Sequence, residues 1–367
     1  MQESFSAVDE VDLALINALQ VTPRASWAQL GKALAIDPAT AARRWERLRE
    51  VGLAWVTCVL GPALHTYFCM AYAEVACEPA RLDAAGDFLA RHGSVRYVYH
   101  LTGSHQLLVA SSHRTPAEVS GHLAQVLAAA PGVRSYRAEL RTVGFGESSR
   151  WRLRSLDAAQ RGLLAGGAVD RRGGGSAGQS PPALGSEGAY QELYQLLQED
   201  GRMPFAQLAR RSGVSEPTVR RRVKLLLDQR LLRLRCEVAQ SVTGWPVTAV
   251  LWATVPPEQL DVAGRALTVL PDVRVCCALT GPRNLMLVVW LRTLDELPAL
   301  EARIARQHGV VVVDRAVCLR TVKQMDRLLD ADGRAVGFAP ALLAPAAAQQ
   351  GAEQEMGDTG LSPADPA

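Results

Sequence analysis

The stretch EPTVRRRVKLLLDQRLL, Glu216–Leu232, combines a cluster of cations with the apolar spacing of an amphipathic helix. At about 100° per residue, one face of this helix carries Val219, Val223 and Leu226. Ser215 is a favourable N-cap, and Pro217 is compatible with the first turn. The sequence therefore predicts a helix that buries its apolar face and exposes a basic one.

A second helix precedes this one across a tight turn. The segment FAQLARRSG ends at Gly213, and two helices joined in this way are typical of a helix-turn-helix whose second helix enters the DNA major groove. Between Arg202 and Arg235, ten basic residues stand against two acids, which favours a polyanion as partner. We therefore expect double-stranded DNA as the partner. The expected DNA contacts on this helix are Thr218, Arg220, Arg221, Arg222 and Lys224.

The whole unit occurs twice. The segment DPATAARRWERLREVGL, residues 37–53, is a less basic version of the first stretch, and an offset of 178 also relates LTGSHQLLV at Leu101 to LTGPRNLML at Leu279. A constant offset over such a distance indicates a duplicated unit. The expected DNA contacts in the first copy are Thr40, Arg43, Arg44 and Arg47. This copy has an alanine and a glutamate where the second has Arg220 and Lys224, so we expect it to bind DNA more weakly.

Each copy continues with alternating strand-like and helical segments. In the second copy these are WPVTAVLWATV, PEQLDVAGRALTVL, DVRVCCALT, NLMLVVWL, LDELPALEARIARQH and VVVVDRAVCLRTV, and the first copy repeats the order. The order βαββαβ is that of the ferredoxin-like fold. Helices would cover one face of each antiparallel sheet, so we expect the other faces to pair, within or between chains.

These patterns predict an α+β protein made of two helix-turn-helix domains and two ferredoxin-like effector domains. The expected bounds are 8–56 and 57–146 for the first copy, 147–186 for a linker, 187–234 and 235–328 for the second copy, and 329–367 for a disordered tail. Gly, Ser and Pro dominate the segment DRRGGGSAGQSPPALGSEG, which is typical of a flexible linker.

The order AQLARRSGVSEPTVRRRVKLL, then a βαββαβ domain with LTGPRNLMLVV, then LRTVKQ, resembles the Lrp/AsnC family of leucine-responsive-type transcriptional regulators. The resemblance covers about residues 8–145 and 187–328. It implies a winged-type helix-turn-helix, dimers formed by sheet pairing that often assemble further, and small-molecule effectors that are commonly amino acids. This chain carries the whole unit twice, so it looks like a tethered dimer.

The family's effector loop typically places an Asp three residues after a Gly, between the second and third strands. The matching residues here are Gly103, His105 and Gln106 in the first copy and Gly281, Arg283 and Asn284 in the second. Both acids are replaced by amides, which pair more weakly with the ammonium group of an amino acid. The alternatives are therefore an amino-acid effector, a different effector, or loops that only connect strands.

Other functions fit less well. No P-loop, G-x-G-x-x-G or Ser/His/Asp array is evident, so we expect no cofactor and no enzyme activity. Six of the seven histidines lie in the first effector domain without zinc-ligand spacing, and the seven cysteines form no C-x-x-C pair. With no signal peptide or long apolar run, we expect a cytoplasmic protein. The alternative is a tetrapyrrole enzyme resembling sirohaem decarboxylases of the same architecture, although the aromatic cluster that follows their effector-loop Asn is missing.

Overall fold

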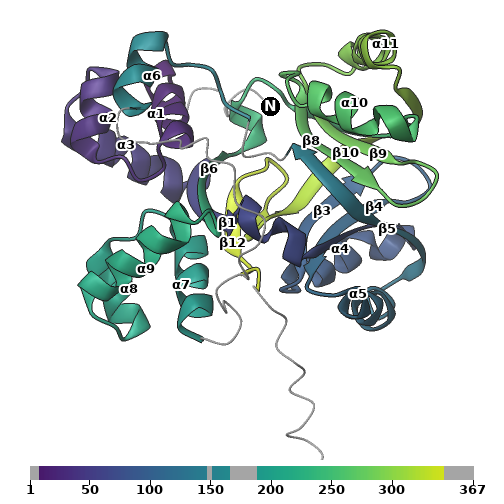
Figure 1. Ribbon diagram of the computed structural model, residues 1–367, viewed down its shortest axis with the longest axis horizontal. Coiled ribbons are helices and arrows are strands. Elements are labelled where there is room, and N and C mark those ends of the chain that lie inside the picture. Colours follow the sequence, from purple (N-terminus) through teal and green to yellow (C-terminus); the bar gives the residue numbers. More distant parts are fainter. Residues whose placement is uncertain (1–7, 147–150, 166–187, 343–367) are drawn as a thin grey trace, which may run out of the picture.

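Both helix-turn-helix domains form as three-helix units. The computed structural model describes residues 8–146, 151–165 and 188–342. The helices are α1 (Glu10–Val21), α2 (Trp27–Leu34), α3 (Pro38–Glu50), α7 (Gly188–Glu199), α8 (Phe205–Ser212) and α9 (Glu216–Asp228). Side-chain caps begin all three helices of the first copy, as where Ser26 and Gln29 form a capping box on α2. The two units lie one above the other on the left of Figure 1.

A two-stranded wing joins the two helix-turn-helix domains. Strands β1 (Ala54–Leu60) and β6 (Leu232–Val238) pair antiparallel, one from each copy. Each wing strand also packs a side chain into the domain of the other copy. Cys58 of β1 lies in the core of the second domain, and Cys236 of β6 lies in the core of the first. The predicted boundaries 56/57 and 234/235 therefore fall inside these strands.

The effector domains have the predicted βαββαβ order. The first contains β2 (Cys69–Cys77), α4 (Leu82–Arg91), β3 (Val95–Leu101), β4 (Leu107–His113), α5 (Pro116–His122) and β5 (Val133–Gly146). The second contains β7 (Val247–Thr254), α10 (Leu260–Leu267), β8 (Val273–Leu279), β9 (Leu285–Leu291), α11 (Glu296–His308) and β10 (Val311–Gln324). A π-helical turn at Leu123–Leu127 extends α5, and short 3-10 turns occupy Pro62–Tyr67, Pro79–Arg81, Gln240–Val242 and Pro257–Gln259. The α+β fold class is confirmed.

The two effector sheets pair with each other within the chain. Strand β5 pairs with β8, placing Arg141 opposite Leu279, and β10 pairs with β3, placing Cys318 opposite Leu101. Since β10 also pairs with β7, eight strands close into a ring in the order β10-β3-β4-β2-β5-β8-β9-β7. Helices α4 and α5 lie outside one half of the ring and α10 and α11 outside the other, on the right of Figure 1.

Two segments differ from expectation. Residues 151–165, assigned to the linker, pack against the first helix-turn-helix domain, where helix α6 (Ala158–Ala165) follows the buried Trp151. Residues 329–342, assigned to the tail, include the end of β11 (Arg327–Leu329) and all of β12 (Ala335–Phe338) at the edge of β10. In both cases apolar side chains anchor a segment whose neighbours in sequence are rich in Gly, Ala or Pro. The rest of both segments, residues 147–150, 166–186 and 343–367, lies outside the described residues.

Candidate nucleic-acid interface and effector loops

Helix α9 presents an accessible basic face. Arg221 is exposed and makes no ion pair with the described part of the chain. Arg220 donates to Glu216 at 2.5 Å, and Lys224 pairs with Asp228 one turn later. Both pairs are exposed and bridge a single helical turn, so they contribute little stability and exchange readily for phosphate.

The two other predicted contacts on α9 have structural partners. Arg222 is half-buried with its guanidinium 5.6 Å from the ring centre of Tyr190 on α7. Thr218 shares a hydrogen bond of 2.9 Å with Ser215 at the helix start. The structure thus places Arg220, Arg221 and Lys224 toward solvent and directs Arg222 toward its own domain.

Helix α3 presents a different face. Arg43, the equivalent of Arg221, is exposed. Arg44 pairs with Asp9 at 2.7 Å and with Asp12 at 3.0 Å, and Arg47 also pairs with Asp12. Asp12 is fully buried and occupies the position of Tyr190 in the second copy. Acids at the N-terminal end of α1 therefore hold two of the three predicted arginines of α3.

Thr40 lies at the start of α3. Its backbone N–H donates to Asp37 Oδ1 at 3.3 Å, which caps the helix. Its side chain is half-buried, like that of Thr218 in the second copy. The two threonines are thus placed alike, although the side chain of Asp37 caps α3 and that of Ser215 makes no such bond to the backbone of α9.

The amides of both effector loops are tied to the protein. Gln106 Oε1 accepts from the backbone N–H of Cys77 at 2.9 Å, and Asn284 Oδ1 accepts from that of Val255 at 3.0 Å. Gly103 and Gly281 both have positive φ, 102° and 92°, where glycine avoids the strain of a side chain. His105 is half-buried and lies 3.3 Å from Ser104 Oγ. These contacts define each loop's shape, whether or not an effector binds there.

Arg283 sits in an acidic cluster made by both copies. Its Nη1 donates to Glu74 Oε2 at 3.3 Å, its Nη2 lies 3.6 Å from Glu139 Oε1, and Asp314 lies at 3.4 Å. Burial lowers the pKa of Arg283, but the three carboxylates outweigh burial and raise it. Burial raises the pKa of Glu139. The three carboxylates beside the second effector loop are therefore already paired with a cation of the chain itself, the guanidinium of Arg283.

The described residues contain neither a metal-binding cluster nor a membrane-spanning helix. No group of three or more His, Cys, Asp or Glu side chains within residues 8–146, 151–165 and 188–342 could hold a metal ion. In the same ranges, no helix has the length and apolar character needed to cross a membrane.

Comparison with known proteins identifies the family. The model of the AsnC-type helix-turn-helix domain matches residues 8–49 and 191–227, and that of the Lrp/AsnC ligand binding domain matches residues 248–328. An uncharacterized HTH-type transcriptional regulator of Pyrococcus abyssi is 32% identical over 134 residues, which are 36% of this chain and 84% of that protein. This chain belongs to the Lrp/AsnC family. The resemblance seen in the sequence is confirmed, and the chain is a transcriptional regulator of the Lrp/AsnC type.

Two further proteins match one copy and both copies of the unit, respectively. The HTH-type transcriptional regulator LrpA of Pyrococcus horikoshii is 26% identical over 133 residues, 36% of this chain and 94% of that protein. A crystal structure of the siroheme decarboxylase NirDL, in complex with an iron-uroporphyrin III analogue, has a TM-score of 0.56 and 16% identity, covering 86% of this chain and 93% of that one. At that identity the likeness shows the fold alone, and it extends over both copies.

Proposed function

We propose that this Lrp/AsnC-family chain binds an operator as a tethered pseudo-dimer and reads it mainly with its second helix-turn-helix. The observation that carries this proposal is the contrast between Arg221 with its exposed neighbours on α9 and the arginines of α3 that are bound by Asp12. Arginine can contact guanine in the major groove or a phosphate. Helix α9 offers more such groups than α3.

Energetics support the contrast. Moving Arg44 and Arg47 onto DNA would leave Asp12 buried and without its two cations, which is costly. Arg220 and Lys224 would leave behind exposed carboxylates, which water solvates, and Arg220 would also leave the ring of Phe205, whose centre lies 4.4 Å from its guanidinium. We therefore assign sequence reading to Arg220, Arg221 and Lys224 on α9, with Thr218 near the helix start, and a supporting phosphate contact to Arg43.

The tether favours a fixed spacing between the two sites on DNA. Paired helix-turn-helix units contact half-sites about one helical turn apart or a multiple of it. Here the β1–β6 wing joins the units directly, so we propose one spacing with two dissimilar half-sites. Self-association of whole chains through the effector domains is part of the proposal, because the family builds such assemblies.

Regulation, not catalysis, is the role that the relatives' names support. The P. abyssi and P. horikoshii proteins are named transcriptional regulators, and we propose that this chain is not an enzyme and works in the cytoplasm on DNA. We also propose that a small molecule controls it. The similarity in fold to the siroheme decarboxylase NirDL favours a second candidate function, that of a tetrapyrrole enzyme. Purified protein with the absorption bands of a bound tetrapyrrole would favour that candidate.

In vitro selection from random duplex DNA tests the proposal. The whole chain should recover sites with one well-defined and one degenerate half at a constant separation. Recovery of symmetric palindromes would contradict the unequal reading. If the selection enriches no sequence although circular dichroism shows that the protein is folded, the proposal that the chain is a sequence-specific regulator is contradicted.

A further inference from the structure

A cavity of about 210 Å³ lies where the first effector sheet meets the wing. Strands β2 to β5, strand β8 and both wing strands contribute to its wall. Its apolar and aromatic side chains include Phe68, Met70, Tyr72, Tyr97, Phe145 and Val275. An apolar cavity of about 150 Å³ can hold benzene. This space therefore accepts a body the size of an aromatic ring with substituents.

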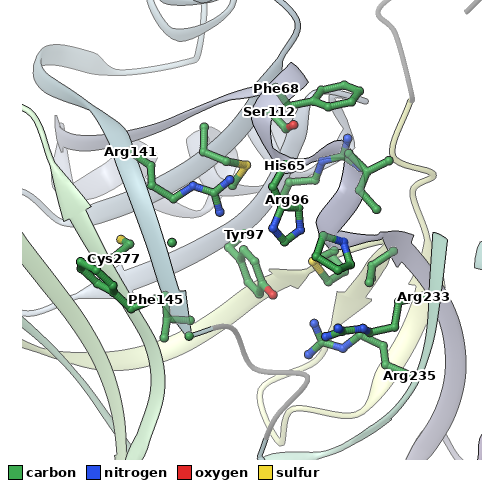
Figure 2. Close-up of a pocket in the computed structure, with 18 of the residues that line it drawn as sticks. His65, Phe68, Arg96, Tyr97, Ser112, Arg141, Phe145, Arg233, Arg235 and Cys277 are labelled. Carbon is green, nitrogen blue, oxygen red and sulfur yellow. The ribbon is translucent and has the colours of Figure 1, made fainter. Parts of the chain in front are cut away.

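The cavity is strongly basic. The arginines in its wall are Arg96, Arg141, Arg230, Arg233 and Arg235. Figure 2 shows Arg141 on one side and Arg233 with Arg235 on the other, with Tyr97 between them. No carboxylate belongs to the described wall, although Arg235 pairs with the buried Glu237 behind it. Cations on opposite sides of an apolar space favour a ligand with separated negative charges.

Buried polar atoms in the wall lack partners among the described residues. Arg96 is 3% exposed, and its Nη2 donates to the carbonyl of Leu342 at 2.9 Å. Its guanidinium also interacts with the hydroxyl of the buried Tyr194 in the same wall, but its Nη1 makes no hydrogen bond of normal geometry with the described residues. The same is true of Ser112 Oγ and of Arg235 Nε. Donors buried without acceptors are rare in folded proteins because they cost free energy. Oxygen acceptors entering the cavity would remove part of that cost.

The equivalent place in the second copy is filled. The offset of 178 relates Arg96 to Arg274 and Ser112 to Trp290. The guanidinium of Arg274 lies 3.8 Å from the ring centre of Trp290 and 4.8 Å from that of Trp151, and the two rings meet edge to face at 5.0 Å. Since a serine stands where the twin carries an indole, the first copy keeps both the space and an unsatisfied guanidinium.

We propose that this cavity binds a small aromatic or similarly apolar molecule that carries two carboxylates. One carboxylate would lie toward Arg141 and the other toward Arg233 and Arg235, with the ring against Tyr97. Arginine suits this task because its planar fork donates two parallel hydrogen bonds to a carboxylate. The site is separate from the two effector loops at Gly103 and Gly281, which lie outside this wall.

The cavity also adjoins the DNA-reading helix. Arg230 follows the end of α9 at Asp228, has a φ of 58°, and is part of the cavity wall. Its carbonyl accepts from the backbone N–H of Ala63 at 3.2 Å, which ties this turn to the first copy. If DNA binding and ligand binding each favour one position of this turn, each changes the affinity of the chain for the other, by linkage. This regulatory part rests on the proposed function, whereas ligand binding does not.

Calorimetry of the whole chain tests binding with three probes on one ring. Isophthalate should bind once per chain, benzoate should bind roughly tenfold more weakly because one charged hydrogen-bonding group is lost, and neutral isophthalamide should not bind. Ser112→Trp should abolish binding of isophthalate, because the twin shows that an indole fits this position. Arg141→Gln should weaken binding roughly tenfold. The control, Arg137→Gln, changes an exposed arginine on the same strand and should bind as the wild type does.

Three results would overturn the proposal: no binding of isophthalate to the wild type, equal binding of the diamide, or undiminished binding to Arg141→Gln. If Ser112→Trp fails to fold, the probe series and Arg141→Gln still decide. Fluorescence anisotropy of a selected DNA site, with and without isophthalate, tests the regulatory part, and unchanged DNA affinity would remove it. If the protein binds no DNA even without isophthalate, the result counts against the proposed function. Failure of the proposed function and failure of the regulatory part are therefore distinguishable.

Discussion

Arg24 and Arg202 hold the two copies together by the same contact made in both directions. Arg24 donates to the carbonyls of Gly201 and Met203 at 2.7 and 2.9 Å, and Arg202 donates to those of Pro23 and Ala25 at 2.7 and 2.9 Å. Each guanidinium also stacks on an aromatic ring of the other copy. The offset of 178 relates the two arginines, so the pair lies about the local twofold axis of the helix-turn-helix domains.

Replacing Arg202 by alanine should loosen this contact. Two charge-assisted hydrogen bonds and one cation–π contact are lost, so the free energy of unfolding should fall by roughly 2–3 kcal/mol. Urea denaturation followed by circular dichroism measures the loss. Arg137→Ala, on an exposed position of β5, is the control and should change stability little. Equal stability of the two variants would show that the copies do not rely on this contact.

The unequal recognition helices predict unequal mutant effects. Arg221→Ala should weaken operator binding more than Arg43→Ala, because α9 carries most of the accessible cations. A lost base contact costs roughly 1–3 kcal/mol, and a lost phosphate contact lowers the salt slope by about 0.9. Titrations of one selected DNA site at several salt concentrations separate these two outcomes. Identical losses of operator affinity in the two variants would contradict the proposal that the two halves read DNA unequally.

A buried histidine cluster predicts acid sensitivity of the first effector domain. The rings of His113 and His122 lie 4.8 Å apart, and that of His92 lies 5.4 Å from His122. Burial, as the largest cause, lowers the pKa of His113 to about 4 and that of His122 to about 3. Below about pH 6.5 these histidines become protonated in the unfolded chain but stay neutral in the native protein. The free energy of unfolding therefore loses nothing to these histidines above pH 6.5, and it should fall as the pH drops from 6.5 toward 4.

The second copy supplies the matched variant for this test. It has Leu291 and Leu300, both buried, where the first has His113 and His122. The double variant His113→Leu/His122→Leu should lose less stability than the wild type between pH 7 and 5. Each histidine contributes up to roughly 1.4 kcal/mol per pH unit. Melting curves at these two pH values give the comparison, and parallel losses in both proteins would exclude the histidines as the cause.

The turn of the first helix-turn-helix contains a strained alanine. Ala35 has a φ of 53°, whereas its equivalent Gly213 has a φ of 67°. A left-handed conformation costs a residue with a side chain roughly 1–2 kcal/mol, partly offset by the lower chain entropy of alanine when unfolded. Ala35→Gly should therefore stabilise the protein by up to about 1 kcal/mol. Ala42→Gly, inside α3, should destabilise it by about as much, and thermal melts of both variants decide the sign.

Local patterns predicted most of the fold. Helical spacing around Val219 and the alternation of strands and helices depend on neighbours in sequence, and the structure has them where expected. The wing pairing was not predictable in this way, because Cys58 and Cys236 pack in each other's domain. The sequence predicts that residues 151–165 belong to the linker, because no periodicity shows that Trp151 meets Trp290.

The site was less predictable for the same reason. The sequence alone predicts that the arginines of α3 are available to DNA, but Asp12, 32 and 35 residues earlier, binds two of them. The sequence alone predicts Arg283 as an effector contact and does not show that Glu74 and Glu139 of the other copy surround it. The basic cavity depends on a serine facing a space that its twin fills with tryptophan. Only a comparison of positions 178 residues apart carries a signal for it.

The closed ring of eight strands gives this regulator a property that separate subunits lack. Two free subunits fall apart when a cell holds few of them, and occupancy of a promoter then varies with the square of their number. Here both halves arrive in one translation product, already joined. Wherever one chain binds a promoter alone, its occupancy follows the abundance of the protein in simple proportion, and fluctuations in expression pass to the target gene without being amplified.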